Sequence, residues 1–310
     1  MNQEQYLKNL SVPTGKVDVI LDTDTFNEID DQFALSYLLL SGEKLRTRAI
    51  CAAPFLNQHS TSPADGMRRS YDEILKLLAL LKTDLPVFHG SESYLADEKT
   101  PVISDAARVI ADTAAEYSPE NPLYVVAIGA ITNVASAILL APEVMRENTV
   151  IVWLGGHARD WPDTKEFNLI QDVAAARVVF GCGAPVVQLP CNGVVSEFRT
   201  TRPELESRLV GKNPLADYLA TNTIREVETS RYFVPGKAWS RIIWDVTAVA
   251  WLLNDGNRFL SSYTVPSPLV QYDGHYSFVQ NRHLITYVYQ VKRDNLFTDL
   301  FQKLTATEHL

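Results

Sequence analysis

Positive charge is the minority charge in this sequence. The 310 residues include 28 Lys and Arg against 37 Asp and Glu, which gives a formal net charge of -9. Nucleic acids and anionic membranes bind proteins through clustered Lys and Arg that displace counterions. The charge balance therefore argues against a polyanionic partner and suits a small uncharged ligand or a metal cation.

Cysteine and long apolar runs are also scarce. The three cysteines, Cys51, Cys182 and Cys191, are odd in number and form no CxxC spacing, so neither a disulfide framework nor a zinc site is indicated. No apolar run approaches the roughly 20 residues of a membrane-spanning helix. The polar first 16 residues lack the apolar stretch of a secretion signal. We therefore expect an untargeted cytoplasmic protein.

Short β-branched apolar runs recur along the chain and are typical of buried parallel strands. They cover residues 17–21, 123–128, 150–154 and 186–189. Between them, apolar residues at spacings of three and four predict helices over residues 33–40, 70–81, 106–115, 134–140 and 173–180. This alternation predicts an α/β fold with a mostly parallel, doubly wound sheet flanked by helices.

A single domain over residues 1–310 is expected, since no Gly/Ser-rich linker, repeat or low-complexity run divides the chain. Residues 199–240 are interpreted as a helical insertion or cap. In open parallel sheets, ligands bind beyond the carboxyl ends of the strands. Gly129 and the pair Gly155-Gly156 each follow a predicted strand, as does an acidic segment. One shared pocket is therefore expected at this edge.

The acidic segment follows the first predicted strand. Five carboxylates fall within ten positions: Asp22, Asp24, Glu28, Asp30 and Asp31. Carboxylates this close repel one another, and calcium, which accepts several oxygen ligands in irregular geometry, relieves the repulsion. The alternative is that Asp30 and Asp31 only favour a helix N-terminus, while Asp22 and Asp24 form a turn.

The order of several motifs resembles that of the inosine-uridine preferring nucleoside hydrolase family. The landmarks are the acidic segment at 22–31, Gly-Ala-Ile-Thr-Asn at 129–133, the glycine pair at 155–156, Glu-Phe-Asn at 166–168 with Asp172, and Trp244-Asp245. The resemblance spans roughly residues 17–253. Asp172 is most simply a helix N-cap.

The resemblance implies hydrolysis of the N-glycosidic bond of ribonucleosides, with a role in purine or pyrimidine salvage. It implies that calcium is bound by Asp24, Asp31, Asp245 and the backbone carbonyl of Ile128, and that Asp24 is also the general base. Candidates for holding the ribose hydroxyls are Asp30, Asn168 and Glu166. An oxocarbenium-like transition state needs such a base and nearby negative charge. Family members are commonly dimers or tetramers, so a homo-oligomer is implied too.

The sequence departs from the family pattern beside the leaving base. Trp244 stands where the inosine-uridine members have a histidine that protonates the base, so this general acid is absent. A purine-preferring subgroup resembles this pattern and stacks tryptophan on the base, which slightly favours purine nucleosides here. The alternative is that Trp244 is a core aromatic. Further stacking candidates are Tyr94, Trp161 and Tyr232.

The contacts to the sugar depart from the pattern as well. Two extra residues in the loop at 25–29 allow Asn27 or Glu28 to reach the pocket or to face solvent. Asp160 corresponds most simply to an asparagine that lies near the sugar in the family. His157, beside the glycine pair, is either a substitute proton donor or an ordinary loop residue.

Two other functions stay open at this stage. The run Asp22-Thr23-Asp24-Thr25 also fits a haloacid-dehalogenase-type phosphatase with Asp22 as nucleophile, although the lysine and paired aspartates of that class are not evident. A catalytically silent nucleoside-binding or sugar-binding relative is the alternative outside enzymes. Trp244 and Asp160 motivate this second reading.

Overall fold

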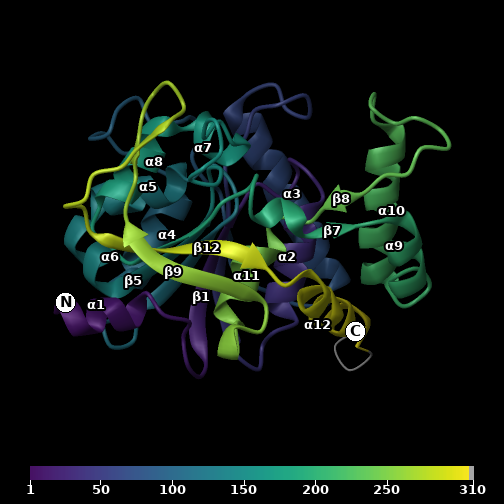
Figure 1. Cartoon of the computed structure of the whole chain (residues 1–310), viewed down its shortest axis with the longest axis horizontal. Helices are drawn as coiled ribbons and strands as arrows, with labels where there is room; N and C mark the ends of the chain where they lie inside the picture. The colour runs from purple at the N-terminus through teal and green to yellow at the C-terminus, as the bar shows by residue number, and fades with distance from the viewer. Residues whose placement is uncertain (307–310) are drawn as a thin grey trace.

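In the computed structural model, which describes residues 1–306, eight strands form one sheet in the order β3-β2-β1-β4-β5-β6-β12-β9 (Figure 1). Every pairing is parallel except that of β12 with β9. The mostly parallel, doubly wound α/β fold is therefore confirmed. The bounds are β1 (Val17–Thr23), β2 (Leu45–Ala52), β3 (Val87–Phe88), β4 (Leu123–Ala127), β5 (Thr149–Leu154), β6 (Val186–Leu189), β9 (Leu260–Pro266) and β12 (Leu284–Val291).

Helices cover both faces of the sheet, and the alternation of side chains along the strands explains the two apolar cores. In β1, Val19 and Leu21 pack in one core while Ile20 packs in the other. No helix within residues 1–306 is long and apolar enough to cross a membrane. The helices of this layer structure are α1 (Gln3–Asn9), α2 (Asp30–Leu39), α3 (Pro63–Leu80), α4 (Asp105–Ala114), α5 (Thr132–Leu140), α6 (Pro142–Asn148), α7 (Phe167–Gln171), α8 (Val173–Gly181), α11 (Val246–Leu252) and α12 (Arg293–Thr305).

The segment at 199–240 leaves and re-enters the fold at one point. Two short strands, β7 (Arg199–Thr200) and β8 (Arg241–Ile242), pair antiparallel at its base. Between them lie α9 (Arg202–Arg208) and α10 (Pro214–Thr229), which stand together at one end of the molecule (Figure 1). Whether these helices act as a cap stays a prediction.

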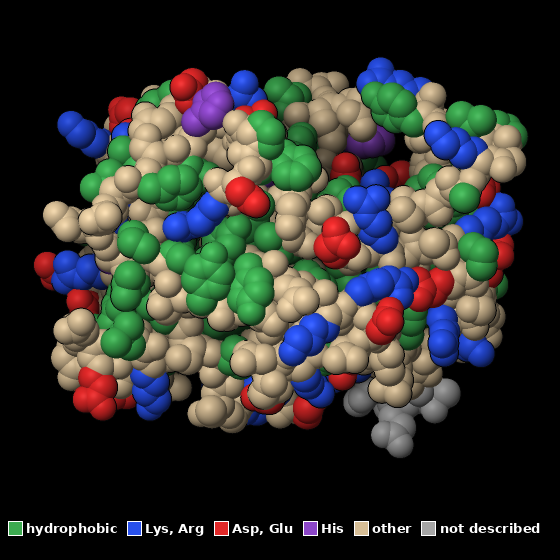
Figure 2. Space-filling view, viewed as in Figure 1, with side chains coloured by type: hydrophobic (Ala, Val, Ile, Leu, Met, Phe, Trp, Pro, Cys, Tyr) green, Lys and Arg blue, Asp and Glu red, His purple; other side chains and the backbone are tan. Residues whose placement is uncertain are grey.

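The antiparallel edge of the sheet was not predicted from the sequence. Hydrophobic side chains gather on the face that carries β9 and β12 (Figure 2). Tyr263 and Tyr289, one from each strand, are about half exposed, and their ring centroids lie 5.3 Å apart. A second pair of short strands, β10 (Leu269–Val270) and β11 (Tyr276–Ser277), lies in the connection between β9 and β12.

Candidate active site

A cavity of about 270 Å³ lies at the carboxyl edge of the sheet. Its lining comes from the segments that directly follow β1, β4, β5 and β6, together with Trp244 and Asp245 before α11. This is the edge at which parallel sheets bind ligands, because the connecting loops supply polar groups there. The segments that the sequence singled out therefore meet in one place.

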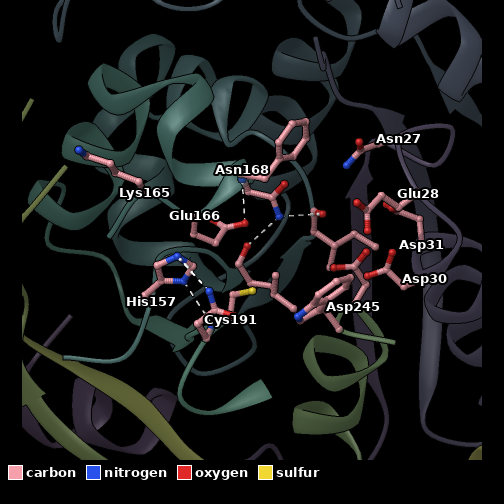
Figure 3. Close-up of a pocket in the computed structure, with 15 residues that line it drawn as sticks. Asn27, Glu28, Asp30, Asp31, His157, Lys165, Glu166, Asn168, Cys191 and Asp245 are labelled. Carbon is pink, nitrogen blue, oxygen red and sulfur yellow. Dashed lines mark hydrogen bonds between the residues drawn. The ribbon is translucent and has the colours of Figure 1, made fainter. Parts of the chain in front are cut away.

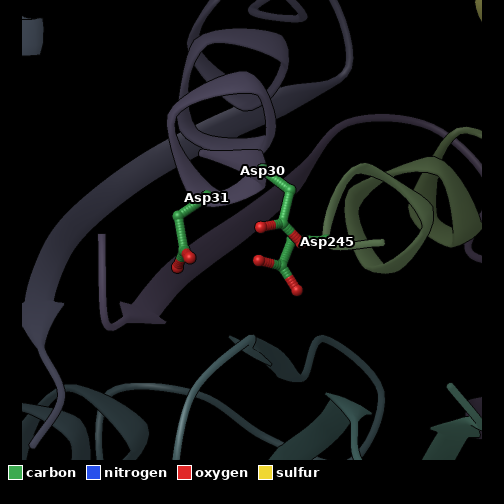
Figure 4. Close-up of side chains that lie close together, drawn as sticks. All are labelled: Asp30, Asp31 and Asp245. Carbon is green, nitrogen blue, oxygen red and sulfur yellow. The ribbon is translucent and has the colours of Figure 1, made fainter. Parts of the chain in front are cut away.

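Three buried aspartates converge on this cavity (Figure 4). One carboxylate oxygen from each of Asp30, Asp31 and Asp245 lies within 4.8 Å of the others. Asp30 and Asp31 form the first turn of α2, while Asp245 precedes α11 and makes no capping hydrogen bond with its side chain. The Asp245 side chain therefore does not cap α11.

Asp24 adds a fourth carboxylate to this group. It is fully buried, and neither of its side-chain oxygens has a hydrogen-bond partner within residues 1–306. Gly129 allows this arrangement, since a Cβ atom at that position would lie 3.0 Å from Asp24 Cγ. Burial, followed by repulsion from Asp31 and Asp30, raises the pKa of Asp24 well above its usual value.

The other carboxyls respond to the same environment. Burial raises the pKa of Asp31 to about 6, although the Thr23 hydroxyl, which donates to Asp31 Oδ1 at 2.5 Å, opposes the shift. Burial and the neighbouring aspartates raise the pKa of Asp30 and of Asp245 well above the usual range. Buried carboxylates with so few donors are unfavourable unless a cation compensates them. An oxygen-only set of this kind suits a hard divalent cation.

Ile128 lines the same cavity. Asn168 Nδ2 donates to the Ile128 carbonyl and to that of Leu154, each at 3.1 Å. Its amide group therefore links the ends of β4 and β5. A carbonyl oxygen has a second lone pair, so the Ile128 carbonyl retains the capacity to bind a cation.

Glu166 lies across the cavity from the aspartates, near His157 and Cys191 (Figure 3). Its carboxylate accepts from the backbone N–H groups of Gly156, Asn168 and Leu169 at 2.8–2.9 Å and caps α7. Burial raises its pKa to about 7 despite these donors. Glu166 therefore both caps a helix and lines the cavity.

The extended loop after β1 does reach the cavity. Asn27 and Glu28 both contribute to its lining, on the same side as the three aspartates (Figure 3). Asn57 donates to Asn27 Oδ1 at 2.6 Å, so Asn57 supports this loop. Trp244 also lines the cavity; it is partly buried and packs against the larger apolar core, so it contacts both the core and the cavity.

Several sequence candidates lie elsewhere. Asp160 is exposed and does not line the cavity, so the structure does not bring this predicted sugar ligand to the site. Tyr94, Trp161 and Tyr232 are also outside the lining, and Tyr232 is 77% exposed. Tyr94 donates instead to Gln171 Oε1.

The structure also shows the environments of Asp172 and Asp22, for which the sequence suggested roles. Asp172 is the N-cap of α8 and accepts from Ala175 N at 2.9 Å, as predicted. Asp22, the nucleophile of the phosphatase alternative, is fully buried, accepts from Asn133 at 2.8 Å and does not line the cavity. Asp24 is buried to the same degree and is likewise not among the lining residues, so exposure does not separate these two aspartates.

The sequence analysis missed part of the lining, including Cys191 and Asn192. Both follow β6, so the rule that loops at one sheet edge converge could have found them. His157 lines the cavity and accepts from Asn192 N at 3.3 Å, and burial lowers its pKa. Of the six histidines, His309 lies outside the described residues.

The fold and the cavity define an α/β protein with a buried acidic pocket in which three carboxylates have the spacing of metal ligands. The family assignment follows from the sequence: the model of the inosine-uridine preferring nucleoside hydrolases matches residues 19–283, and the chain belongs to that family. The protein is therefore an enzyme that acts on the N-glycosidic bond of ribonucleosides.

Individual relatives agree with this assignment. The chain is 28% identical over 267 residues to the pyrimidine-specific ribonucleoside hydrolase RihA of Salmonella paratyphi A, covering 76% of this chain and 79% of the relative. It resembles a plant nucleoside hydrolase with a TM-score of 0.73 at 21% identity, over 94% of this chain and 99% of the other. A purine-preferring ribonucleoside hydrolase from Gardnerella vaginalis matches with a TM-score of 0.68 at 20% identity, over 93% and 98%.

Proposed function

We propose that the protein is a calcium-dependent ribonucleoside hydrolase that slightly favours purine nucleosides. The observation that carries the calcium assignment is the buried, oxygen-only group formed by Asp30, Asp31 and Asp245, with Asp24 beside it. Calcium accepts six to eight oxygen ligands and tolerates irregular geometry, whereas magnesium demands a near-octahedral shell. The proposed ligands are Asp24, Asp31, Asp245 and the Ile128 carbonyl.

Each part of the site has a proposed role in the reaction. A bound calcium ion supplies positive charge that acidifies water and holds vicinal sugar hydroxyls. Asp24 is the proposed general base, because its oxygens have no hydrogen-bond partner within residues 1–306 and it lies beside the other three aspartates. Asp30, Asn168 and Glu166 hold the ribose hydroxyls. The surrounding carboxylates stabilise positive charge that develops on the sugar as the glycosidic bond breaks.

Trp244 carries the proposed preference for purines. Its half-buried ring lines the cavity, and the larger π-surface of a purine gains more from stacking than that of a pyrimidine. The relatives differ in the base preference that their names state, since the Salmonella protein is described as pyrimidine-specific and the Gardnerella protein as purine-preferring. The preference therefore rests on Trp244 alone.

Replacing Trp244 tests this preference. We expect Trp244→Ala to lower kcat/KM for inosine and adenosine by about 10-fold, the equivalent of the roughly 1.4 kcal/mol that an aromatic pair contributes. Uridine and cytidine should lose less. Trp161→Ala, which removes an exposed tryptophan outside the cavity, is the control. Equal losses for all four nucleosides would contradict the stacking role.

Replacing Glu166 tests the sugar contact. Glu166→Gln retains the shape but loses one of the two carboxylate acceptors that now bind three backbone N–H groups. We expect KM for ribonucleosides to rise about 10-fold, the effect of one lost charge-assisted hydrogen bond. Asp160→Asn makes the same chemical change at an exposed site and should leave KM unaltered. Steady-state kinetics with inosine distinguish the two results.

A nucleoside panel tests the activity itself. The purified protein is incubated with purine and pyrimidine ribonucleosides and with 2′-deoxyinosine, and released reducing sugar is measured. We expect ribose from the ribonucleosides and little from 2′-deoxyinosine, which lacks one of the two hydroxyls to be held. No release from any ribonucleoside would favour a silent binding protein. The predicted homo-oligomer, a dimer or tetramer, is tested separately by light scattering.

A further inference from the structure

Arg241 connects two residues that line the candidate active site, Glu28 and Trp244, to helix α10. It lies on β8, three residues before Trp244, and its guanidinium carbon is 5.2 Å from the centroid of the Trp244 ring. Arg241 Nη2 lies 2.6 Å from Glu28 Oε2 in the loop after β1 and 3.2 Å from Glu226 Oε1 on α10. The arginine side chain is only 15% exposed, so solvent screens these contacts weakly.

The surroundings of Arg241 exclude a simple electrostatic role. Burial alone would lower the pKa of the guanidinium, but Glu28, Asp30 and Glu226 outweigh burial and raise it. Two carboxylates contact this single positive charge and a third lies near it. The group therefore has no net positive charge with which to stabilise a departing base. Its contribution must come through the geometry that it imposes.

Trp244 depends on Arg241 for its orientation. The indole Nε1 of Trp244 is buried and has no hydrogen-bond partner within residues 1–306. Packing against the apolar core and the stacked guanidinium are thus the contacts that fix the ring. A guanidinium is planar and stacks on aromatic faces, and its remaining N–H groups still bind carboxylates. The two glutamates in turn fix the plane of the guanidinium.

We infer that Arg241 is a positioning residue for departure of the base: it holds the Trp244 ring and the Glu28 loop in the geometry in which a purine stacks. This inference rests on the proposed function and extends it to a residue that does not line the cavity. Glu28 belongs to the loop with two extra residues. The contact between Arg241 and Glu28 therefore involves a segment in which this chain departs from its family's pattern.

A pair of substrates distinguishes a positioning role of Arg241 from an unspecific loss of activity in the variant. Adenine is a poor leaving group, so cleavage of adenosine depends on enzyme contacts that stabilise the departing base. The p-nitrophenolate of p-nitrophenyl β-ribofuranoside is a good leaving group, so its cleavage depends little on such contacts. We expect Arg241→Ala to lower kcat for adenosine by up to about 10-fold, no more than the loss expected for Trp244→Ala, with little change in KM. Turnover of the nitrophenyl riboside should stay close to that of the wild type. Arg241→Lys, which keeps the cation but loses the planar fork, should restore part of the loss.

The control and the double variant complete the test. Arg225→Ala removes an exposed arginine from the same helix as Glu226 and should leave both substrates unaffected. If Arg241 acts through Trp244, adding Arg241→Ala to Trp244→Ala should lower adenosine turnover little further. Fully additive losses, or equal losses on both substrates, would overturn the inference while leaving the hydrolase assignment intact. A wild-type protein that cleaves neither substrate would instead remove the proposed function and the inference with it.

Discussion

Asp24→Asn is expected to lower kcat for ribonucleoside hydrolysis by about 10²-fold to 10⁴-fold, the range for loss of a general base. The amide has the size of the carboxylate but cannot accept a proton from water. The Asp24 oxygens have no protein partner within the described residues, so the substitution breaks no hydrogen bond of the fold. Ribose release from inosine measures the effect.

Two comparisons make the Asp24 result specific. Asp160→Asn makes the identical chemical change at an exposed position outside the cavity and should keep wild-type turnover. Thermal unfolding of Asp24→Asn without calcium should show no loss of stability, because the variant removes one of several buried like charges. An Asp24→Asn protein that turns over inosine at a rate close to that of the wild type would refute the general-base role.

Removal of calcium is expected to have the second large effect, on stability. A ligand present at 1,000 times its dissociation constant stabilises the folded state by about 4 kcal/mol. Chelation should remove that stabilisation and leave the carboxylates of Asp30, Asp31 and Asp245 facing one another. Differential scanning calorimetry with calcium, and then with excess EDTA, measures the change in Tm. An unchanged Tm would argue against a bound cation.

The effect of chelation should depend on pH in a defined direction. The pKa of Asp31 rises from 3.8 to about 6 on folding, and burial with mutual repulsion also raises those of Asp24, Asp30 and Asp245. The metal-free folded state therefore binds more protons than the unfolded state, and its stability falls as the pH rises above about 4. Near neutral pH, calcium should reverse the loss. Metal-free protein whose stability increases from pH 5 to pH 7 would contradict these shifts.

The sequence was most informative where one local rule applied to several segments. The apolar runs at 17–21, 123–128, 150–154 and 186–189 became β1, β4, β5 and β6. Because parallel strands present their carboxyl ends to one edge, the acidic segment, Gly129 and the glycine pair could be expected to meet. That Asp245 joins Asp30 and Asp31 there was implied only by the resemblance to the family.

Prediction failed where tertiary contacts decide the outcome. Asp160 matched a family position by spacing alone, yet the loop after β5 leaves it exposed. Arg241 carries no motif of its own, and its importance appears only when Glu28, Glu226 and Trp244 surround it. The antiparallel pairing of β9 with β12 was missed because β9 lies at a sheet edge and buries only Leu260 and Val265, so it is not one continuous apolar run.

Calcium titration of metal-free protein tests the central claim most directly. The protein is freed of metal with EDTA, dialysed and titrated with calcium, while bound calcium and ribose release from inosine are measured in the same samples. We predict no turnover without metal and full turnover once about one calcium is bound per chain, as a single group of oxygen ligands implies. Undiminished ribose release from fully metal-free protein would contradict the account.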